Sequence, residues 1–248
     1  MTNPTSNSVI CGDCLEVMKD IPDNGVDCVI TSPPYNMRLR IRNGQYTTRE
    51  KSEHFSKKYA HFADDLPIND YFDFHRQCIA EMLRVSPLAF INIQIVTGSK
   101  EAWFKLIGEY AEYIKDVIIW DKGFGQPAMH PAVINRASEL ILVLENPKTA
   151  GRAFTKSYFD RGTMSDIWRI GRGGKGQNAG HGAVFSEELV SIILNGWTKE
   201  GDVILDPFNG TGTVSKTAKT LNRHFIGIDI SQEYCDIANE RLKQGVLL

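Results

Sequence analysis

The order of apolar and polar residues along the chain predicts strands that alternate with helices. Short runs rich in β-branched residues are typical of buried strands, and apolar residues at every third or fourth position are typical of helices packed on one face. The run 88–96 is almost continuously apolar at its start, which suits a parallel sheet covered on both faces. The predicted strands are 8–10, 26–30, 88–96, 117–120, 139–145, 202–205 and 225–229. The predicted helices are 14–19, 70–85 with Asn69 as its cap, 99–113, 186–195, 213–221 and a last one that Ser231 caps and that ends near Lys243.

This alternation predicts an α/β fold, a three-layer sandwich around a mostly parallel sheet of seven strands. A length of 248 residues and a hydrophobic content of 42% fit a single domain, residues 1–248. Three segments lack a clear period and are expected to be loops, namely 37–66, 122–137 and 146–182. Glycine is frequent in the last of them from Gly162 onward, which indicates a flexible connection or a loop that orders on a ligand.

The composition excludes several classes of protein. No apolar run approaches the 18 or so residues of a membrane span, and Met1–Asn7 lacks the apolar core of a secretory signal. Five cysteines, an odd number outside any small secreted framework, indicate a reduced, cytoplasmic protein. Cys11 and Cys14 have CxxC spacing, but no second pair follows, so no metal site is expected. A net charge of −2 gives no general attraction to nucleic acid, so a DNA-binding surface must be local.

The first candidate for chemistry is the sequence Ser32-Pro33-Pro34-Tyr35, which follows the predicted strand 26–30. Each proline fixes its φ and lacks an N–H, so the pair ends the strand and stiffens the backbone. We expect a rigid ledge that offers a hydroxyl, backbone carbonyls and an aromatic face. A flat ring with an NH2 group would stack on Tyr35 and donate to Ser32 Oγ and to a proline carbonyl. The alternative is an ordinary loop or a proline-type recognition peptide.

The second candidate is the segment Val203–Thr213, which reads as a strand, a glycine turn and the start of a helix. Gly210 and Gly212 let the backbone approach a ligand closely, and Asp229 at the end of the next strand can accept hydrogen bonds from ribose hydroxyls. This pattern fits any nucleoside cofactor. A dinucleotide-dependent oxidoreductase is the rival class, but the third glycine of its fingerprint is replaced by Ser215, and it would leave the ledge unexplained.

Together, the ledge and the segment 205–213 resemble the motifs of S-adenosylmethionine-dependent DNA amino-methyltransferases of the N4-cytosine/N6-adenine family. The resemblance extends with gaps from Val9 to Leu242. It implies a Rossmann-like methyltransferase fold in circularly permuted order, because the ledge precedes the cofactor motif. It also places the strand 203–205 first in the sheet and 225–229 second, with the N-terminal strand beside the second.

The resemblance further implies residue roles. Ser32, Pro33, Pro34 and Tyr35 would be catalytic, and S-adenosylmethionine would be the cofactor. The residues that would hold the cofactor are Asp206, Phe208, Gly210, Gly212 and Thr213 on its methionine side, Asp229 and Ile230 at its ribose, Asp13 and Cys14 near its adenine amine, and His181 and Phe185 in a segment that closes over it.

A basic segment follows the ledge directly. Residues 37–58 hold seven arginines and lysines against two glutamates, and a chain of this charge beside a base pocket could follow a phosphate backbone. The alternative is a solvated surface loop, since most runs of charged residues lie in such loops. The expected DNA contacts are Arg38, Arg40, Arg42, Lys57, Lys58 and, in the glycine-rich segment, Lys175. The three predicted loops, 37–66, 122–137 and 146–182, are the expected DNA-recognition loops.

The resulting hypothesis is methyl transfer to the exocyclic amine of a base flipped out of double-stranded DNA. Ser32 favours N4 of cytosine, whereas Asn36 is also seen among adenine enzymes, so N6 of adenine stays open. Two other functions stay open as well, namely methylation of RNA or of a protein amide, and DNA binding without catalysis. A second copy of the chain and a cognate restriction endonuclease are further partners that the family allows.

Overall fold

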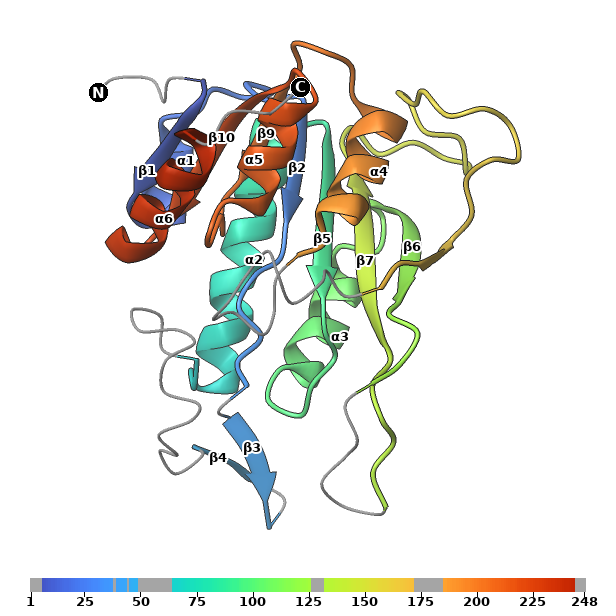
Figure 1. Ribbon diagram of the computed structural model, residues 1–248. Coiled ribbons are helices and arrows are strands. Elements are labelled where there is room, and N and C mark those ends of the chain that lie inside the picture. Colours follow the sequence, from blue (N-terminus) through green and yellow to red (C-terminus); the bar gives the residue numbers. More distant parts are fainter. Residues whose placement is uncertain are drawn as a thin grey trace.

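The structure, a computed structural model, describes residues 6–37, 39–43, 45–48, 64–125, 132–171 and 185–243. Its framework is a sheet of eight strands in the order β1-β10-β9-β2-β5-β7-β6-β8, and β3 pairs with β4 in a separate two-stranded ribbon (Figure 1). The strands are β1 Ser8–Cys11, β2 Cys28–Thr31, β3 Leu39–Arg42, β4 Gln45–Thr48, β5 Leu88–Ile93, β6 Ile114–Asp121, β7 Ser138–Glu145, β8 Ile167–Arg169, β9 Val203–Asp206 and β10 His224–Asp229. The helices are α1 Cys14–Lys19, α2 Ile68–Val85, α3 Lys100–Glu109, α4 Glu187–Trp197, α5 Thr213–Thr220 and α6 Gln232–Lys243.

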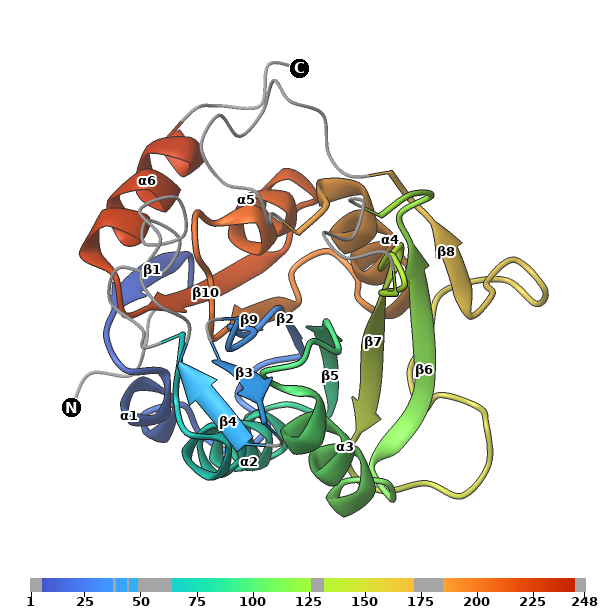
Figure 2. The ribbon, with the colours of Figure 1, turned by 90° about the horizontal axis from the view of Figure 1, so that it is seen from below.

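Helices cover both faces of the sheet and form the predicted three layers. Helices α1, α2 and α3 lie on one face, and α4, α5 and α6 lie on the other (Figure 2). Successive strand residues point to opposite faces, so Val29 belongs to the first apolar core while its neighbours Cys28 and Ile30 belong to the second. Burial of strand residues on both sides explains why these strands read as continuous apolar runs and not as alternating ones.

The order of strands confirms the predicted neighbours of β10. Strand β10 pairs in parallel with β9 on one side and with β1 on the other, and β2 pairs with β9 and β5. Strand β7 is the exception, because it runs antiparallel to both β5 and β6. Its first residues therefore lie at the edge of the sheet where its neighbours end.

Eight strands replace the predicted seven. The additional strand, β8, comes from the glycine-rich segment and pairs in parallel with β6 from Ile119↔Ile167 to Asp121↔Arg169. It is three residues long, which is too short to show a period, and its buried Trp168 holds it against the second core. Whether the chain order is a circular permutation within the family stays a prediction.

The loop 37–66 also contains unexpected order. Strands β3 and β4 form an antiparallel ribbon from Leu39↔Thr48 to Arg42↔Gln45. The signal for it is the pair Asn43-Gly44, because Asn43 adopts a φ of +51°, the left-handed conformation that tight hairpin turns require. In Figure 1 the ribbon lies beyond the carboxyl ends of β2 and β5, away from the body of the sheet.

Several element boundaries differ from prediction, and β5, for example, ends at Ile93 and not at residue 96. Helix α2 begins at Ile68, so the N-cap position falls on Pro67 and not on Asn69. Proline has its φ preset and no N–H to satisfy, so it is well suited to precede a first turn. Helix α3 ends at Glu109, because the chain then turns through Tyr110 and enters β6 at Ile114. Ser231 does cap α6, since its Oγ accepts the N–H of Tyr234 at 3.3 Å.

Candidate active site

The two sequence motifs meet at the carboxyl edge of the sheet. Strands β2 and β9 are neighbours, and each ends at one of the motifs. The hydroxyl of Thr31, the residue before Ser32, donates a 2.7 Å hydrogen bond to Oδ1 of Asp206, which opens the glycine turn. Ligands of parallel α/β sheets bind outside the carboxyl ends of the strands. The structure therefore places both motifs at the carboxyl edge of the sheet, as predicted. We call this edge the rim.

The carboxylate of Asp229 fixes the backbone of the glycine turn after β9 by hydrogen bonds. One carboxylate oxygen of Asp229 accepts the N–H of Gly210 at 2.8 Å, and the other accepts the N–H of Ser231 at 2.9 Å. Gly210 has a φ of +49° and Gly212 a φ of +82°, conformations that side chains disfavour. A Cβ at Gly212 would lie 2.8 Å from Cβ of Ala238, whereas a Cβ at Gly210 would meet nothing within 4 Å. Gly212 is thus needed for packing, and Gly210 borders open space.

The carboxyl end of β1 lies beside the end of β10, at the same edge of the sheet. The N–H of Gly12 bonds to the carbonyl of Asp229 at 2.9 Å, and Asp13 caps α1 by accepting the N–H of Leu15 at 2.8 Å. The side chain of Cys14 is buried, with its Sγ 3.9 Å from Sγ of Cys78. Only the backbone of Cys14 can therefore reach a ligand on this rim. All five cysteines are free thiols.

The carboxyl group of Asp206 has an unusual environment. It is almost fully buried, and burial raises its pKa to about 7, although hydrogen bonds from Thr31 and from the N–H of Phe208 oppose that rise. The negative charge of Asp229 adds to it. A cation bound beside Asp206 would offset the cost of burying this charge.

These residues fit a cationic nucleoside cofactor. Two carboxylates, Asp206 and Asp229, end adjacent strands, and Gly210 leaves room beside the turn. Ile230 follows directly and is 50% exposed, which offers an apolar surface for a planar ring. Among the described residues, no group of three or more histidine, cysteine or carboxylate side chains is suited to hold a metal ion. Across the same ranges, no helix has the length and apolar character needed to cross a bilayer.

Phe208 is supported by an aromatic cluster below the turn. Its ring stacks at 6.2 Å on the ring of His75 and meets Phe74 edge-on at 6.0 Å. His75 is fully enclosed, and its Nδ1 lies 2.8 Å from the carbonyl of Tyr71. Burial lowers the pKa of His75 to about 4, against the opposing effect of that carbonyl. The ring is thus neutral at pH 7 and serves as packing beneath Phe208.

Buried hydrogen bonds hold the backbone of the ledge, which is what its predicted rigidity requires. Pro33 and Pro34 are buried, and the carbonyl of Pro34 accepts a 2.7 Å hydrogen bond from the hydroxyl of Tyr71. Asn36 follows with a φ of +53° and donates to the carbonyls of Leu66 and Gly98 at 2.9 and 3.2 Å. Since the Pro34 carbonyl already has a donor, the Pro33 carbonyl is the better candidate for a ligand amine.

The ring of Tyr35 is less accessible than predicted. Tyr35 is only 5% exposed, because its hydroxyl turns into the edge of the sheet. There Tyr35 Oη lies 2.9 Å from Ser32 Oγ and donates to Oε2 of Glu139 at 3.1 Å. The predicted open stacking platform is therefore wrong for this state of the protein. A base could stack on the ring only after a rearrangement that uncovers it.

A buried polar network extends from the ledge and was missed at the level of sequence. Asn92 Nδ2 donates to Glu139 Oε2 at 2.7 Å and to Tyr35 Oη at 3.0 Å, and it lies 3.4 Å from Ser32 Oγ. Lys122 Nζ lies 2.6 Å from Glu139 Oε1 in a buried ion pair. Asn92 Oδ1 is a buried acceptor for which the described residues supply no donor. We call Ser32, Tyr35, Asn92, Glu139 and Lys122 the ledge network.

The ledge network comes from the ends of four different strands, because Ser32 and Tyr35 follow β2. Asn92 lies near the carboxyl end of β5, Lys122 follows β6, and Glu139 is the second residue of β7. Glu139 reaches the rim because β7 is antiparallel, so that its start lies beside the ends of its neighbours. A glutamate begins the predicted strand 139–145, but another glutamate ends it, so the sequence alone does not mark Glu139 as a site residue.

Several predicted contacts lie elsewhere or outside the described residues. The ring of Phe185 meets Trp120 edge-on at 6.4 Å and packs against the second core, so its role at the cofactor stays a prediction. Arg42 is exposed on β3, and Arg40 is described only as part of that strand's backbone. The remaining predicted residues lie outside the described ranges, namely Arg38, Lys57, Lys58, Lys175 and His181.

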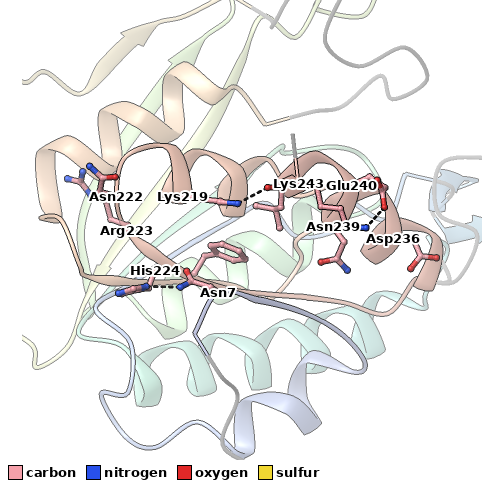
Figure 3. A pocket seen from close by; sticks show the side chains of 11 residues that line it. Asn7, Lys219, Asn222, Arg223, His224, Asp236, Asn239, Glu240 and Lys243 are labelled. Atoms are coloured by element: carbon pink, nitrogen blue, oxygen red, sulfur yellow. Dashed lines mark hydrogen bonds and ion pairs between the residues drawn. The ribbon is translucent and has the colours of Figure 1, made fainter. Parts of the chain in front are cut away.

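A pocket of about 890 Å³ lies at the opposite end of β10, between that strand and helices α5 and α6 (Figure 3). Its polar groups bond to one another. Lys219 Nζ donates to the carbonyl of Leu242 at 2.7 Å, Lys243 pairs with Glu240, and Asn7 bonds to His224. These internal bonds leave it a poor candidate for chemistry, and the rim at the carboxyl edge remains the site.

Comparison with known proteins identifies the family of this chain. The family model of N6/N4 methyltransferases, described as DNA methylase, matches residues 26–240. Type II methyltransferase M.BglII of Bacillus subtilis is 26% identical over 268 residues, which cover 95% of this chain and 69% of that protein.

Two solved structures share the fold. PvuII DNA methyltransferase, described as cytosine-N4-specific, superposes with a TM-score of 0.69 at 17% identity, over 99% of this chain and 89% of its own. The complex of M1.HpyAVI with SAM superposes with a TM-score of 0.60 at 22% identity, over 95% of this chain and 99% of its own. At such identities the likeness concerns the fold, which confirms the predicted Rossmann-like class.

Proposed function

The chain belongs to the N6/N4 DNA methylase family, and we propose that it transfers a methyl group from S-adenosylmethionine to the exocyclic amine of a base in double-stranded DNA, with N4 of cytosine as the target. The observation that carries this proposal is the hydrogen bond between Thr31 and Asp206, because it fixes the end of the ledge strand to the start of the glycine turn. A donor held at the turn and an amine held at the ledge then share one rim.

The residues of the rim suit the donor. S-adenosylmethionine, when bound, would supply a methyl group on a positively charged sulfur. An amine nitrogen would bond to the methyl carbon as the bond to sulfur breaks, S-adenosylhomocysteine would leave, and the amine proton would pass to water. Asp206 and Asp229 supply negative charge beside the turn, and Ile230 supplies an exposed apolar surface. The solved complex of M1.HpyAVI with SAM, which shares this fold, supports the choice of cofactor.

The ledge suits the acceptor. Ser32 Oγ and the Pro33 carbonyl are the acceptors that would take the two N–H bonds of an amino group and orient its nitrogen. Orientation of this kind can supply about 7–11 kcal/mol of a reaction barrier. The base must first leave the duplex, at a cost of about a few kcal/mol. Ser32 is a neutral acceptor, and on the family resemblance this favours N4 of cytosine over N6 of adenine.

The ribbon β3–β4 supports DNA as the substrate. It lies beyond the carboxyl ends of β2 and β5, next to the edge of the sheet that carries the site (Figure 1). A two-stranded ribbon is of a size that the major groove admits, and this one carries Arg42 exposed next to its turn. The surrounding sequence adds the basic residues that would neutralise phosphates.

Expression in a host that lacks DNA methylation tests the proposal. Genomic DNA and total RNA are digested to nucleosides and analysed by mass spectrometry, and single-molecule sequencing locates the modified positions. We expect N4-methylcytosine in DNA at one short sequence, and none with the Tyr35→Ala variant. N6-methyladenine in its place would overturn the choice of base. Modified RNA with unmodified DNA, or no modified nucleoside at all, would overturn the function.

A further inference from the structure

The ledge network has a defined order of donors and acceptors. The hydroxyl of Tyr35 has a single proton, which it donates to Glu139 Oε2. Of the two hydroxyls that lie 2.9 Å apart, only that of Ser32 can therefore donate to the other. The proton of Ser32 thus points into the network, towards Tyr35 Oη. What Ser32 can offer a ligand is its lone pairs.

Asn92 reinforces this order. Its amide carries two protons, and the two nearest acceptors are Glu139 Oε2 at 2.7 Å and Tyr35 Oη at 3.0 Å. The opposite amide orientation would bring its oxygen against the carboxylate, which cannot donate. Tyr35 Oη accordingly accepts from Asn92 and from Ser32 while it donates to Glu139. No position on that oxygen remains from which its proton could turn back towards Ser32.

The order depends on the charge of Glu139. A carboxylate only accepts, so it draws the proton of Tyr35 towards itself and, through Tyr35, that of Ser32. Lys122 Nζ lies 2.6 Å from the other oxygen of Glu139, and both side chains are less than a tenth exposed. A buried charge needs an opposite charge beside it, and Lys122 supplies that charge on the side away from Tyr35.

We infer that Glu139, paired with Lys122, is a positioning residue that makes Ser32 an acceptor-only group and so selects a base with an amino group over one with a carbonyl at the same place. Cytosine and adenine present N–H donors there, and uracil and hypoxanthine present an oxygen. An oxygen opposite the lone pairs of Ser32 has no proton to share, and an unpaired buried polar group is costly. The inference rests on the proposed function and adds to it the group that sets the direction of the bond.

The decisive substitution is Glu139→Gln. The amide of glutamine can donate to Tyr35 Oη, which allows the hydroxyl of Tyr35 to turn towards Ser32 and the proton of Ser32 to turn towards the base. We expect a fall in kcat of at least about tenfold, as is common when a positioned hydrogen-bonding group is lost. The KM for S-adenosylmethionine should stay within about twofold, because the glycine turn is untouched.

The chain supplies a matched control at the other end of the same strand. Glu145 is also a buried partner of a lysine, since its Oε2 lies 3.1 Å from Nζ of Lys115, and it lies far from the ledge. Glu145→Gln therefore removes a comparable buried charge without touching the network. A loss of kcat in Glu145→Gln equal to that in Glu139→Gln would show that the effect is structural and would overturn the inference.

Discrimination between bases gives a readout that folding cannot mimic. Binding is measured on duplexes that carry the target base or its carbonyl counterpart, uracil for cytosine or hypoxanthine for adenine, with S-adenosylhomocysteine present. The carbonyl base forms a mismatch in the duplex, and this mismatch affects binding by wild type and by Glu139→Gln equally. We therefore compare, between the two proteins, the ratio of the affinity for the amino base to the affinity for the carbonyl base. We expect the preference for the amino base to fall at least about tenfold.

A double substitution tests the route. Because Glu139 acts on Ser32 through the hydroxyl of Tyr35, Tyr35→Phe combined with Glu139→Gln should be no slower than Tyr35→Phe alone. Additive losses would overturn the inference, as would a Glu139→Gln enzyme with wild-type kcat and wild-type discrimination. Absence of DNA methylation in the wild-type protein is a different result, because it would overturn the proposed function itself.

Discussion

The hydroxyl of Thr31 and the carboxyl group of Asp206 lie 175 positions apart in the chain and are joined by a buried 2.7 Å hydrogen bond. The bond joins the last residues of β2 and β9, two neighbouring parallel strands. It ties the ledge that would hold the base to the turn that would hold the methyl donor. Substitutions on either side of it should therefore affect stability and cofactor binding together.

Thr31→Val removes this bond with little change in shape. We expect a loss of about 1–3 kcal/mol in the free energy of unfolding, because Asp206 keeps its burial and loses a donor. Affinity for S-adenosylmethionine, measured by calorimetry, should fall as well. Thr217→Val is the matched control, since Thr217 is also buried but bonds only to the carbonyl of Thr213 within its helix. If both variants lose cofactor affinity equally, the bond has no special role at the rim.

The raised pKa of Asp206 predicts a pH dependence of stability. Its pKa is about 7 in the folded protein and about 4 in the unfolded chain, so its contribution is fully present below pH 4 and is lost as pH rises through 7. Asp206→Asn removes this pH-dependent contribution to the free energy of unfolding, which is worth up to about 4 kcal/mol. Relative to wild type, the variant should therefore gain melting temperature between pH 5 and pH 8 in the absence of cofactor. Parallel profiles for the two proteins would contradict the assigned pKa.

His75 predicts the opposite trend at acid pH. Burial lowers its pKa from 6.5 to about 4, so its contribution is present above pH 6.5 and is lost as pH falls through 4. The loss amounts to about 3 kcal/mol. In His75→Phe, which keeps an aromatic ring against Phe208, the fall in unfolding free energy between pH 6.5 and 4 should become shallower by a similar amount. If the fall in unfolding free energy between pH 6.5 and 4 is the same in the variant and the wild type, protonation of His75 does not destabilise the fold.

The two glycines of the turn should respond differently to alanine. Gly212→Ala places a Cβ 2.8 Å from Cβ of Ala238 and should cost at least about 2 kcal/mol of unfolding free energy. Gly210→Ala meets nothing within 4 Å and should cost only about 1 kcal/mol, from its positive φ. Its effect should appear in weaker cofactor binding, measured by calorimetry. Equal losses of stability in both variants would show that the turn is uniformly packed.

The basic segment after the ledge should set the salt dependence of DNA binding. Replacement of Arg38, Arg40 and Arg42 by glutamine should reduce the slope of log Kd against log salt by about 0.9 for each phosphate that these arginines neutralise in the wild-type complex. The matched control replaces three exposed lysines outside the basic segment, Lys19, Lys148 and Lys243. A slope that changes equally in both triple variants would assign the effect to total charge.

Most of the framework could be predicted because the strands are buried on both faces. The apolar runs that became β2, β5, β7, β9 and β10 are unambiguous for that reason, and the paired motifs at 32–35 and 205–213 fixed the edge at which the site lies. The short strands β3, β4 and β8 could not be found by periodicity, since three or four residues hold at most two alternations. The Asn43-Gly44 turn was the one local signal for the ribbon.

The cofactor side of the site was predictable and the ledge side was predictable only in part. Asp206, Gly210 and Asp229 belong to local motifs, in which sequence neighbours are also neighbours in space. The two residues that bond to the hydroxyl of Tyr35 are distant in the chain, since Asn92 is 57 positions and Glu139 is 104 positions from it. Nothing local distinguishes Asn92 or Glu139 from ordinary polar residues in strands. Their position depends on the direction of β7, which only the sheet topology reveals.

The reversed direction of β7 has a consequence for how the protein can vary. The segment between β6 and β7 leaves the rim at Lys122 and returns to it at Glu139, and its base is closed by the ion pair between them and by a 2.8 Å bond from the N–H of Lys122 to the carbonyl of Ala137. The chain between Lys122 and Glu139 thus starts and ends at one fixed anchor. If the proposed function holds, exchange of that segment between relatives is expected to change which DNA sequence is read, while the chemistry at the ledge is inherited unchanged.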